Sequence, residues 1–253
     1  MPGILPKTSA RPGPGRVVLL GAGPGSADLL TVRGARLLGL ADVVLHDALV
    51  GPDVLALCAQ ARLVAVGKRA GQASMPQDEI NAKLVLAAQE HALVIRLKGG
   101  DPMLFGRADE EMQALEAAGI PYEVVPGVTT AFAAAAASRQ PLTKRGVARS
   151  VAFFTSTNGD GQPEQTSLPS CDTLVQYMGG REAIQTAERL LAAGKSPEMP
   201  VLAVENCSLP QQRILRLSLA ELAQGRLEQL RQGHSGPVLV MAGWAMQVRP
   251  SQS

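Results

Sequence analysis

The stretch RVVLLGAGPGSADLLTVRGARLLGL, residues 16–40, decides the fold class. It begins with an apolar, β-branched run at 16–20 and turns at three glycines within five residues. It then continues with apolar residues at helical spacing over 29–40. A strand, a tight glycine turn and a helix in this order form the first half of a βαβ unit, whose strands run parallel.

The same alternation of strand-like and helix-like segments continues along the chain, which predicts an α/β protein with a largely parallel sheet. Further strands are expected at 42–45, 63–66, 93–97, 122–125, 150–155, 174–177, 201–204 and 238–241. Further helices are expected to begin at 54 and to span 77–90, 110–118, 128–138 and 181–193.

This pattern divides the sequence into four parts. A Pro/Gly-rich leader at 1–15 is expected to be disordered, and its apolar part is too short for a secretory signal. Because the leader lacks acidic residues, an organellar transit peptide stays an alternative. An N-terminal α/β domain is expected at 16–130, a linker at 131–149 and a C-terminal α/β domain at 150–248.

Composition excludes several classes of function. Among the 253 residues, 24 Lys and Arg face 22 Asp and Glu, and the net charge of +2 argues against a general nucleic-acid binder. No apolar run approaches the ~20 residues that span a bilayer, so no membrane partner is expected. The three cysteines and three histidines lack metal-ligand spacing, so no metal site is expected. So few cysteines suit a reducing, cytoplasmic compartment.

Three glycine-containing turns follow predicted strands: GAGPG at 21–25, GGDP at 99–102 and PGVTT at 126–130. Ligands of open α/β sheets bind beyond the carboxyl ends of strands, where backbone amides are free. The first turn does not favour phosphate, because Pro24 removes an amide donor and Ser26 replaces the third glycine of the dinucleotide fingerprint.

Polar residues at these strand ends have a structural and a functional interpretation. Asp101 either stabilises a turn or accepts hydrogen bonds from a ligand hydroxyl or amine. Thr129 and Thr130 either cap a helix or contact an anionic group at its positive end. Asp47 and Lys68 either form a surface ion pair or relay protons.

Basic residues also gather near the strand ends, which indicates either a solvated surface or a site for carboxylates. They are Lys68, Arg69, Arg96, Lys98, Arg107, Lys144, Arg145 and Arg149.

Eight motifs occur in one order: GAGPGSADLLT, VVLHDALV, VGKRAG, VIRLKGGDPMLFGR, ALEAAGIPYEVVPGVTTA, PLTKRGVARSV, QYMG and VENCSLPQQR. In this combination the chain resembles the uroporphyrinogen-III C-methyltransferases of the tetrapyrrole methylase superfamily, over residues 16–245. The resemblance implies two α/β domains with a cleft between them, usually in a homodimer. It implies transfer of two methyl groups from S-adenosylmethionine to C2 and C7 of uroporphyrinogen III. The products are precorrin-2, by way of precorrin-1, and S-adenosylhomocysteine, on the way to sirohaem, cobalamin or haem d1.

The resemblance also implies roles for individual residues. Asp47 matches a proton acceptor, Lys68 a proton donor, and Arg107 a catalytic residue that also meets the substrate. The other substrate positions are Glu110, Arg145 and Arg149, where basic residues suit a polycarboxylate and the segment 131–149 faces the substrate. The cofactor positions are Pro24, Gly99, Gly100, Asp101, Leu104, Thr129, Thr130, Met178 and Cys207. No metal is implied.

The sequence departs from the usual family pattern at Ala48, Lys144, residues 156–158 and Cys207. It carries no dehydrogenase/ferrochelatase extension, so the resemblance implies a monofunctional enzyme. Three alternatives stay open at this point. They are a methylase of a different tetrapyrrole precursor, a non-catalytic protein that binds adenosylmethionine or a porphyrinoid, and a NAD-linked oxidoreductase, which Ser26 disfavours.

Overall fold

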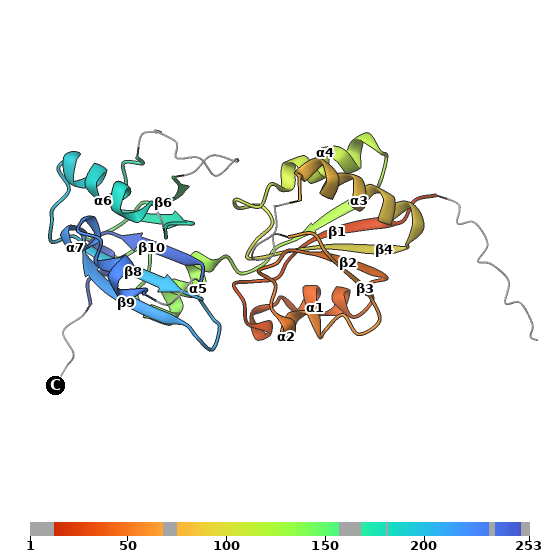
Figure 1. Ribbon diagram of the computed structural model, residues 1–253, viewed down its shortest axis with the longest axis horizontal. Helices are drawn as coiled ribbons and strands as arrows, with labels where there is room; N and C mark the ends of the chain where they lie inside the picture. The colour runs from red at the N-terminus through yellow and green to blue at the C-terminus, as the bar shows by residue number, and fades with distance from the viewer. Residues whose placement is uncertain (1–12, 68–74, 157–167, 181, 233–235, 249–253) are drawn as a thin grey trace, which may run out of the picture. The chain divides into compact units, whose positions relative to one another are not determined.

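The computed structural model describes residues 13–67, 75–156, 168–180, 182–232 and 236–248 (Figure 1). The chain divides into two compact units, residues 1–128 and 129–253, and each unit contains one five-stranded sheet. This architecture confirms the predicted α/β class. Within the described ranges, no helix has both the length and the apolar character needed to cross a membrane.

The sheet of the first unit is entirely parallel, as the sequence predicted. Across the sheet its strands are β3 (Arg62–Ala65), β2 (Val43–His46), β4 (Leu93–Lys98), β1 (Arg16–Gly21) and β5 (Tyr122–Val125). Because all five strands run in one direction, their carboxyl ends and the loops that follow lie along the same edge of the sheet.

Two pairs of helices cover the faces of this sheet. They are α1 (Val32–Leu38) and α2 (Pro52–Leu55) on one face, and α3 (Gln77–Glu90) and α4 (Ala108–Ala117) on the other (Figure 1). Successive side chains of a strand point to opposite faces of the sheet, so Val18 and Leu20 of β1 pack in the core with α1 and α2. Val17 and Leu19 pack in the core with α3 and α4. A strand buried on both faces reads as a continuous apolar run, as RVVLL does.

Two local differences from the predicted elements have simple causes. The helix expected over 29–40 is divided into η1 (Ala27–Leu29) and α1, because Thr31 has an extended backbone and caps α1. Its Oγ1 accepts the N–H of Gly34 at 3.0 Å, which fixes the start of the helix there. Gly15, the last residue of the expected leader, is buried and donates its N–H to the Ala88 carbonyl at 2.7 Å.

The sheet of the second unit is mixed, so the prediction of a largely parallel sheet is wrong for this half. Across the sheet its strands are β6 (Val151–Thr155), β7 (Thr173–Tyr177), β10 (Val238–Ala242), β8 (Pro200–Glu205) and β9 (Arg213–Ser218). Only β6 and β7 pair in parallel, and the other neighbours are antiparallel. The strand β9 was not predicted, and it pairs with β8 as a hairpin.

Helices also cover both faces of the second sheet. They are α5 (Thr130–Ser138) on one face, and α6 (Ala183–Ala192), α7 (Leu219–Ala223) and α8 (Arg226–Leu230) on the other (Figure 1). A short η2 (Trp244–Met246) follows β10. Ala131 and Ala134 of α5 share a buried cluster with Leu142, Ala148 and Met241. The segment 131–149, which the sequence suggested as a linker, therefore packs as part of the second unit.

Candidate active site

The first two glycine turns are joined to each other at the carboxyl edge of the first sheet. The N–H of Ala22 donates to the Lys98 carbonyl at 2.7 Å, which extends the pairing of β1 and β4 beyond the strands. Gly23 and Gly100 then exchange two backbone hydrogen bonds, at 3.2 and 2.7 Å. The turns 21–25 and 99–102 therefore form one rigid piece.

The third turn is pressed against the other two so closely that only glycine fits. A Cβ on Gly127 would lie 2.2 Å from the Gly100 carbonyl oxygen and 2.8 Å from the Gly21 Cα. A Cβ on Gly21 would lie 2.6 Å from the Gly127 Cα. Gly100 itself has a φ of +67°, which a glycine adopts without strain. The three turns thus form a backbone floor, which we call the glycine floor (residues 21–25, 99–102 and 126–128).

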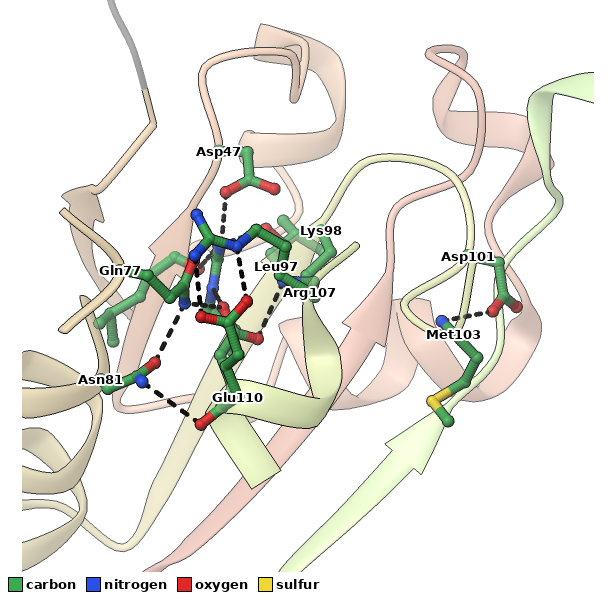
Figure 2. Close-up of polar contacts among 12 residues, drawn as sticks. Asp47, Gln77, Asn81, Leu97, Lys98, Asp101, Met103, Arg107 and Glu110 are labelled. Carbon is green, nitrogen blue, oxygen red and sulfur yellow. Dashed lines mark hydrogen bonds and ion pairs between the residues drawn. The ribbon is translucent and has the colours of Figure 1, made fainter. Parts of the chain in front are cut away.

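Asp101 holds this floor together through its side chain. Its Oδ1 accepts the Met103 N–H at 2.8 Å (Figure 2), and its Oδ2 accepts the Gly127 N–H at 3.0 Å. Both structural roles leave lone pairs on the two oxygens, so the carboxylate can also accept hydrogen bonds from a ligand. Pro24 and Leu104, in the same loops, are half-buried.

The charge of the floor is negative. Asp101 is the only ionisable residue in the segments 21–25, 99–104 and 126–128, which contain neither lysine nor arginine. These three segments therefore offer a pyrophosphate no cation, whereas they offer a positively charged ligand a carboxylate.

Asp47 lies directly after β2 (Figure 2), and its carboxylate contacts Arg96 of the neighbouring strand β4. The Arg96 Nη2 donates to Asp47 Oδ1 at 2.5 Å, and the Asp47 side chain is 31% exposed. The backbone of Gly67, after β3, packs against Asp47 and Ala48, because a Cβ there would lie 2.1 Å from the Ala48 nitrogen. Lys68, the expected proton donor, lies outside the described residues.

Two members of the basic group belong to the protein interior. Arg96 and Lys98 project from β4 toward α3 and α4, and both are buried. Glu111 of α4, which is fully buried, accepts Arg96 Nε at 2.7 Å and Lys98 Nζ at 2.9 Å. The interpretation of Arg96 and Lys98 as a site for ligand carboxylates is therefore wrong, because both side chains are buried and already donate hydrogen bonds to the Glu111 carboxylate.

Arg107 and Glu110 form an exposed pair at the start of α4 (Figure 2). The Arg107 Nε and Nη2 donate to the two carboxylate oxygens of Glu110 at 2.7 and 2.8 Å. These hydrogen bonds lower the pKa of Glu110. Since the two side chains are 49% and 43% exposed, a ligand carboxylate can compete with Glu110 for the guanidinium.

In the second unit, Thr129 does not cap α5 with its hydroxyl, although it occupies the N-cap position. Its Oγ1 instead lies 2.5 Å from the Tyr177 hydroxyl, which accepts the Ala131 N–H at 3.2 Å. Tyr177 therefore takes over the capping role and fixes the start of the helix. Thr130 is the first residue of α5 and is partly exposed.

Met178 and Cys207 both lie at strained backbone. Met178 has a φ of 55° and is 55% exposed, and Asn206 and Ser208, on either side of Cys207, have φ values of 49° and 65°. Left-handed backbone at such residues costs energy, and strain of this kind clusters at functional sites. Cys207 itself is buried in the core, and burial raises the pKa of its thiol to about 11.

A thiol in this state is expected to be chemically inert. With a pKa of about 11, roughly one Cys207 in 10⁴ is a thiolate at pH 7, so alkylation in the folded protein should be at least ~100-fold slower than for a free cysteine. Iodoacetamide labelling followed by peptide mass mapping measures this. Cys171, which is partly exposed, serves as the internal comparison. Labelling of Cys207 as fast as Cys171 in folded protein would contradict the expectation.

Arg145 and Arg149 lie in the segment between α5 and β6. Residues 144–148 form a tight turn, in which the N–H of Lys144 and the N–H of Ala148 each donate to the other residue's carbonyl. Both arginines are exposed, and in the described part of the chain neither guanidinium forms an ion pair. They differ in this from Arg96, and they are free to meet anionic groups.

The structure adds two functional candidates that the sequence analysis missed. Glu111 was hidden in the acidic run 109–111, although its spacing from Ala108 and Leu115 would have placed it on the buried face of α4. Tyr177 was assigned only to a strand, and no local pattern predicts its contact with Thr129, 48 residues away.

The sequence pattern of the Tetrapyrrole (Corrin/Porphyrin) Methylases matches residues 16–223. A siroheme synthase from Azotobacter vinelandii is 44% identical over 239 residues, which are 93% of this chain and 51% of the relative. A siroheme synthase from Tolumonas auensis is 46% identical over 233 residues, 90% of this chain and 49% of the relative. The chain thus spans about half the length of the curated relatives it matches.

Among solved structures, a uroporphyrin-III C-methyl transferase from Thermus thermophilus, complexed with S-adenyl homocysteine, has a TM-score of 0.81 and 41% identity. The match covers 91% of this chain and 98% of that one. A cobalt precorrin-4 methyltransferase has a TM-score of 0.76 at 29% identity, over 92% of this chain and 96% of that one.

Proposed function

The chain belongs to the tetrapyrrole methylase family, and on that premise we propose that it transfers two methyl groups from S-adenosylmethionine to C2 and C7 of uroporphyrinogen III. The products are precorrin-2, by way of precorrin-1, and S-adenosylhomocysteine. The match over 98% of the Thermus thermophilus enzyme supports this reaction, since that enzyme resembles this chain in sequence as well as in fold.

The observation that carries the proposal is the glycine floor with its single carboxylate. S-adenosylmethionine brings a methyl group on a positively charged sulfur and contains no phosphate. A floor of backbone amides and carbonyls, with Asp101 as its one charged group, fits such a ligand better than it fits a dinucleotide. We propose that Pro24, Gly99, Gly100, Asp101 and Leu104 contact the cofactor from the first unit.

In the second unit, Thr129, Thr130, Met178 and Cys207 stay predicted cofactor contacts. A protonated Cys207 suits this role, because a thiolate would compete with the substrate for the methyl group. The strained backbone at Met178 and around Cys207 supports a functional role for both segments.

The loops at the carboxyl edge of the first sheet also suit an acidic macrocycle built of aromatic pyrrole rings. Leu49, Met103 and Phe105 follow β2 and β4 and leave large apolar side chains exposed. We propose that such side chains contact the ring system, while Arg107, Arg145 and Arg149 bind its carboxylates. Glu110 would then hold Arg107 in place until the substrate arrives.

Methyl transfer needs alignment and the removal of one proton. The pyrrole carbon forms a bond to the methyl carbon while the bond from sulfur breaks, and the sulfur keeps the electron pair. The positive charge passes to the ring, which then loses a proton. We propose that Asp47 accepts this proton, because its carboxylate is partly exposed, ends a strand at the functional edge and is held by Arg96. The role of Lys68 as a proton donor stays a prediction that rests on the family resemblance.

The proposal is tested by anaerobic incubation with uroporphyrinogen III and S-adenosylmethionine, followed by mass analysis of the tetrapyrrole. We expect a gain of two methyl groups. Cofactor binding without any gain would refute the proposed substrate and favour another tetrapyrrole precursor, in line with the weaker likeness to cobalt precorrin-4 methyltransferase, or a non-catalytic role. Cytoplasmic location and homodimer formation stay predictions, made from the cysteine content and from the family resemblance respectively.

Asp101→Ala is expected to weaken binding of S-adenosylmethionine at least ~10-fold, because it removes the floor's carboxylate and frees the Met103 and Gly127 amides. Isothermal titration calorimetry measures the affinity. Asp109→Ala is the matched control, because Asp109 is an exposed aspartate on α4 whose carboxylate accepts, among the described residues, a hydrogen bond from Gln113 only. Unchanged affinity in the Asp101 variant would show that the floor does not hold the cofactor.

A further inference from the structure

The most unusual feature of the first unit is a buried cluster of charges beneath the functional edge. It consists of Arg96, Lys98, Glu111 and Asp47, and only Asp47 reaches solvent. Figure 2 shows the dashed contacts that run from Asp47 inward toward Lys98. Burying charges in this way costs several kcal/mol per ion, and apolar residues of similar volume are often as stable. The cluster therefore calls for a reason beyond stability.

Glu111 is the anchor of this cluster. It projects from α4 and accepts hydrogen bonds from three donors: Arg96 Nε at 2.7 Å, Lys98 Nζ at 2.9 Å and Gln77 Nε2 at 3.4 Å. With this many partners and no exposure, the carboxylate has a single orientation.

Arg96 links Glu111 to Asp47, the member of the cluster that reaches solvent. Its Nε is held by Glu111, and its Nη1 donates to the Leu97 carbonyl at 3.2 Å and lies 3.5 Å from the Leu45 carbonyl. Only Nη2 is left for Asp47, whose Oδ1 it meets at 2.5 Å. A planar guanidinium fixed at two corners presents its third corner in one direction.

Asp47 is consequently held by one oxygen. Among the described residues, Arg96 is the only side chain that bonds its carboxylate, which leaves Oδ2 open. The charged and titratable groups near it are Arg96 and Lys98 from β4, Glu111 from α4, and His46 from β2, whose Nδ1 lies 3.1 Å from the Asp47 carbonyl. Lys68 follows Gly67 but lies outside the described residues.

We propose that Arg96 and Glu111 are positioning residues for methyl transfer: Glu111 fixes the guanidinium of Arg96, and Arg96 fixes the Asp47 carboxylate, with Oδ2 free to accept a proton. This inference rests on the proposed function, in which Asp47 is the proton acceptor. Although burial acts to lower the pKa of Arg96, the carboxylates of Asp47 and Glu111 raise it, so its charge persists throughout the working pH range.

The test separates the charge of Arg96 from its geometry. Arg96→Lys keeps the charge but loses the planar guanidinium with its several N–H donors. A single amine cannot hold both Glu111 and Asp47 in place. We expect kcat to fall at least ~10-fold. Arg96→Gln removes the charge as well as the geometry, and we expect its kcat to fall at least as far as that of Arg96→Lys. The KM values for both substrates should change little in either variant.

Glu111→Gln tests the anchor, and Glu116→Gln on the exposed face of α4 is its matched control. We expect kcat to fall about 10-fold in Glu111→Gln and to stay at the wild-type value in the control. In an Asp47→Asn background, Glu111→Gln and Arg96→Lys should have no further effect, because each acts through Asp47. S-adenosylhomocysteine binding by calorimetry checks that each variant is folded. If Glu111→Gln does not fold, Arg96→Lys alone decides the question, because its cation keeps Glu111 paired.

The outcomes are distinct. An active wild type, an impaired Asp47→Asn, and Arg96→Lys and Glu111→Gln as active as the control would overturn the positioning role and leave the proposed function intact. Losses that persist in the Asp47→Asn background would also overturn it, since the cluster would then act on stability alone. A wild type that binds S-adenosylhomocysteine but methylates no tetrapyrrole would overturn both the function and the inference.

Discussion

A Gly127→Ala variant is expected to lose cofactor binding and to unfold at a lower temperature. The added Cβ would lie 2.2 Å from the Gly100 carbonyl oxygen and 2.8 Å from the Gly21 Cα, both of which are backbone atoms. These neighbours cannot turn aside, because hydrogen bonds between Gly23 and Gly100 hold their two turns together. The third turn must therefore lift off the floor, which also breaks the bond from the Gly127 N–H to Asp101.

Overpacking of this kind costs about 3 kcal/mol, which for a chain of this length lowers Tm by roughly 6–12 °C. The affinity for S-adenosylhomocysteine should fall on the order of 100-fold, because the floor no longer has its shape. Thermal unfolding by circular dichroism and isothermal titration calorimetry measure the two effects.

Two further glycines serve as controls for this variant. Gly39→Ala, at the end of α1, would place its Cβ in ordinary contact 3.7 Å from the Arg36 carbonyl oxygen, at a φ of −69°. It should match the wild type in both measurements. At Gly99 the Cβ would come within 3.9 Å of Leu49 Cβ alone, so Gly99→Ala should fold normally and lose only affinity. Equal Tm values for Gly127→Ala and Gly39→Ala would contradict the steric argument.

Much of the first unit could be predicted from the sequence because its information is local. Each strand is a short apolar run, and each is followed by a turn and a helix, so connectivity and parallel direction follow together. The helix at 77–90 was predicted with its observed bounds, because Ile80, Leu84 and Ala88 mark one buried face. The glycine turns at the strand ends were recognised for the same reason.

The second sheet was harder because its pairing is not local. β9 carries two arginines among its apolar residues, and only Leu217 of its six residues is buried, so its sequence does not resemble that of a buried strand. Its partner β8 is antiparallel, and nothing in either segment alone specifies that direction. The order and direction of these strands depend on how the whole unit packs, and the sequence of a single segment does not contain that information.

In the candidate site, too, local features could be predicted and features that depend on tertiary packing could not. Asp47, Asp101 and the glycines were identified as candidates from their position after strands. The sequence could not show that Arg96 and Lys98 are neutralised by Glu111, which lies 15 and 13 residues further along the chain on a helix. A charged residue in an apolar strand is structural when it has a buried partner and is free to bind a ligand when it has none. The packing of α4 on β4 decides which of the two applies to Arg96 and Lys98.

Asp47→Asn is expected to have the largest effect on catalysis. The amide oxygen of asparagine can still accept the Arg96 Nη2 donor, so the fold and the cluster around Glu111 should be kept. The side chain can no longer take up a proton. Loss of a general base costs roughly 10²–10⁴-fold in rate, and we expect kcat for methyl transfer to fall by that amount.

Asp47 is proposed to act on the tetrapyrrole and not to contact the cofactor. The Asp47→Asn variant should therefore bind S-adenosylhomocysteine with wild-type affinity and unfold at the wild-type temperature. Asp53→Asn is the matched control, because Asp53 is an exposed aspartate in the first turn of α2 and should leave kcat unchanged. Single-turnover methylation of uroporphyrinogen III, followed by mass analysis, gives the rates. If both variants keep the wild-type rate, the proton leaves the ring by another route, and the exposed carboxylate at the end of the buried cluster serves the fold rather than the chemistry.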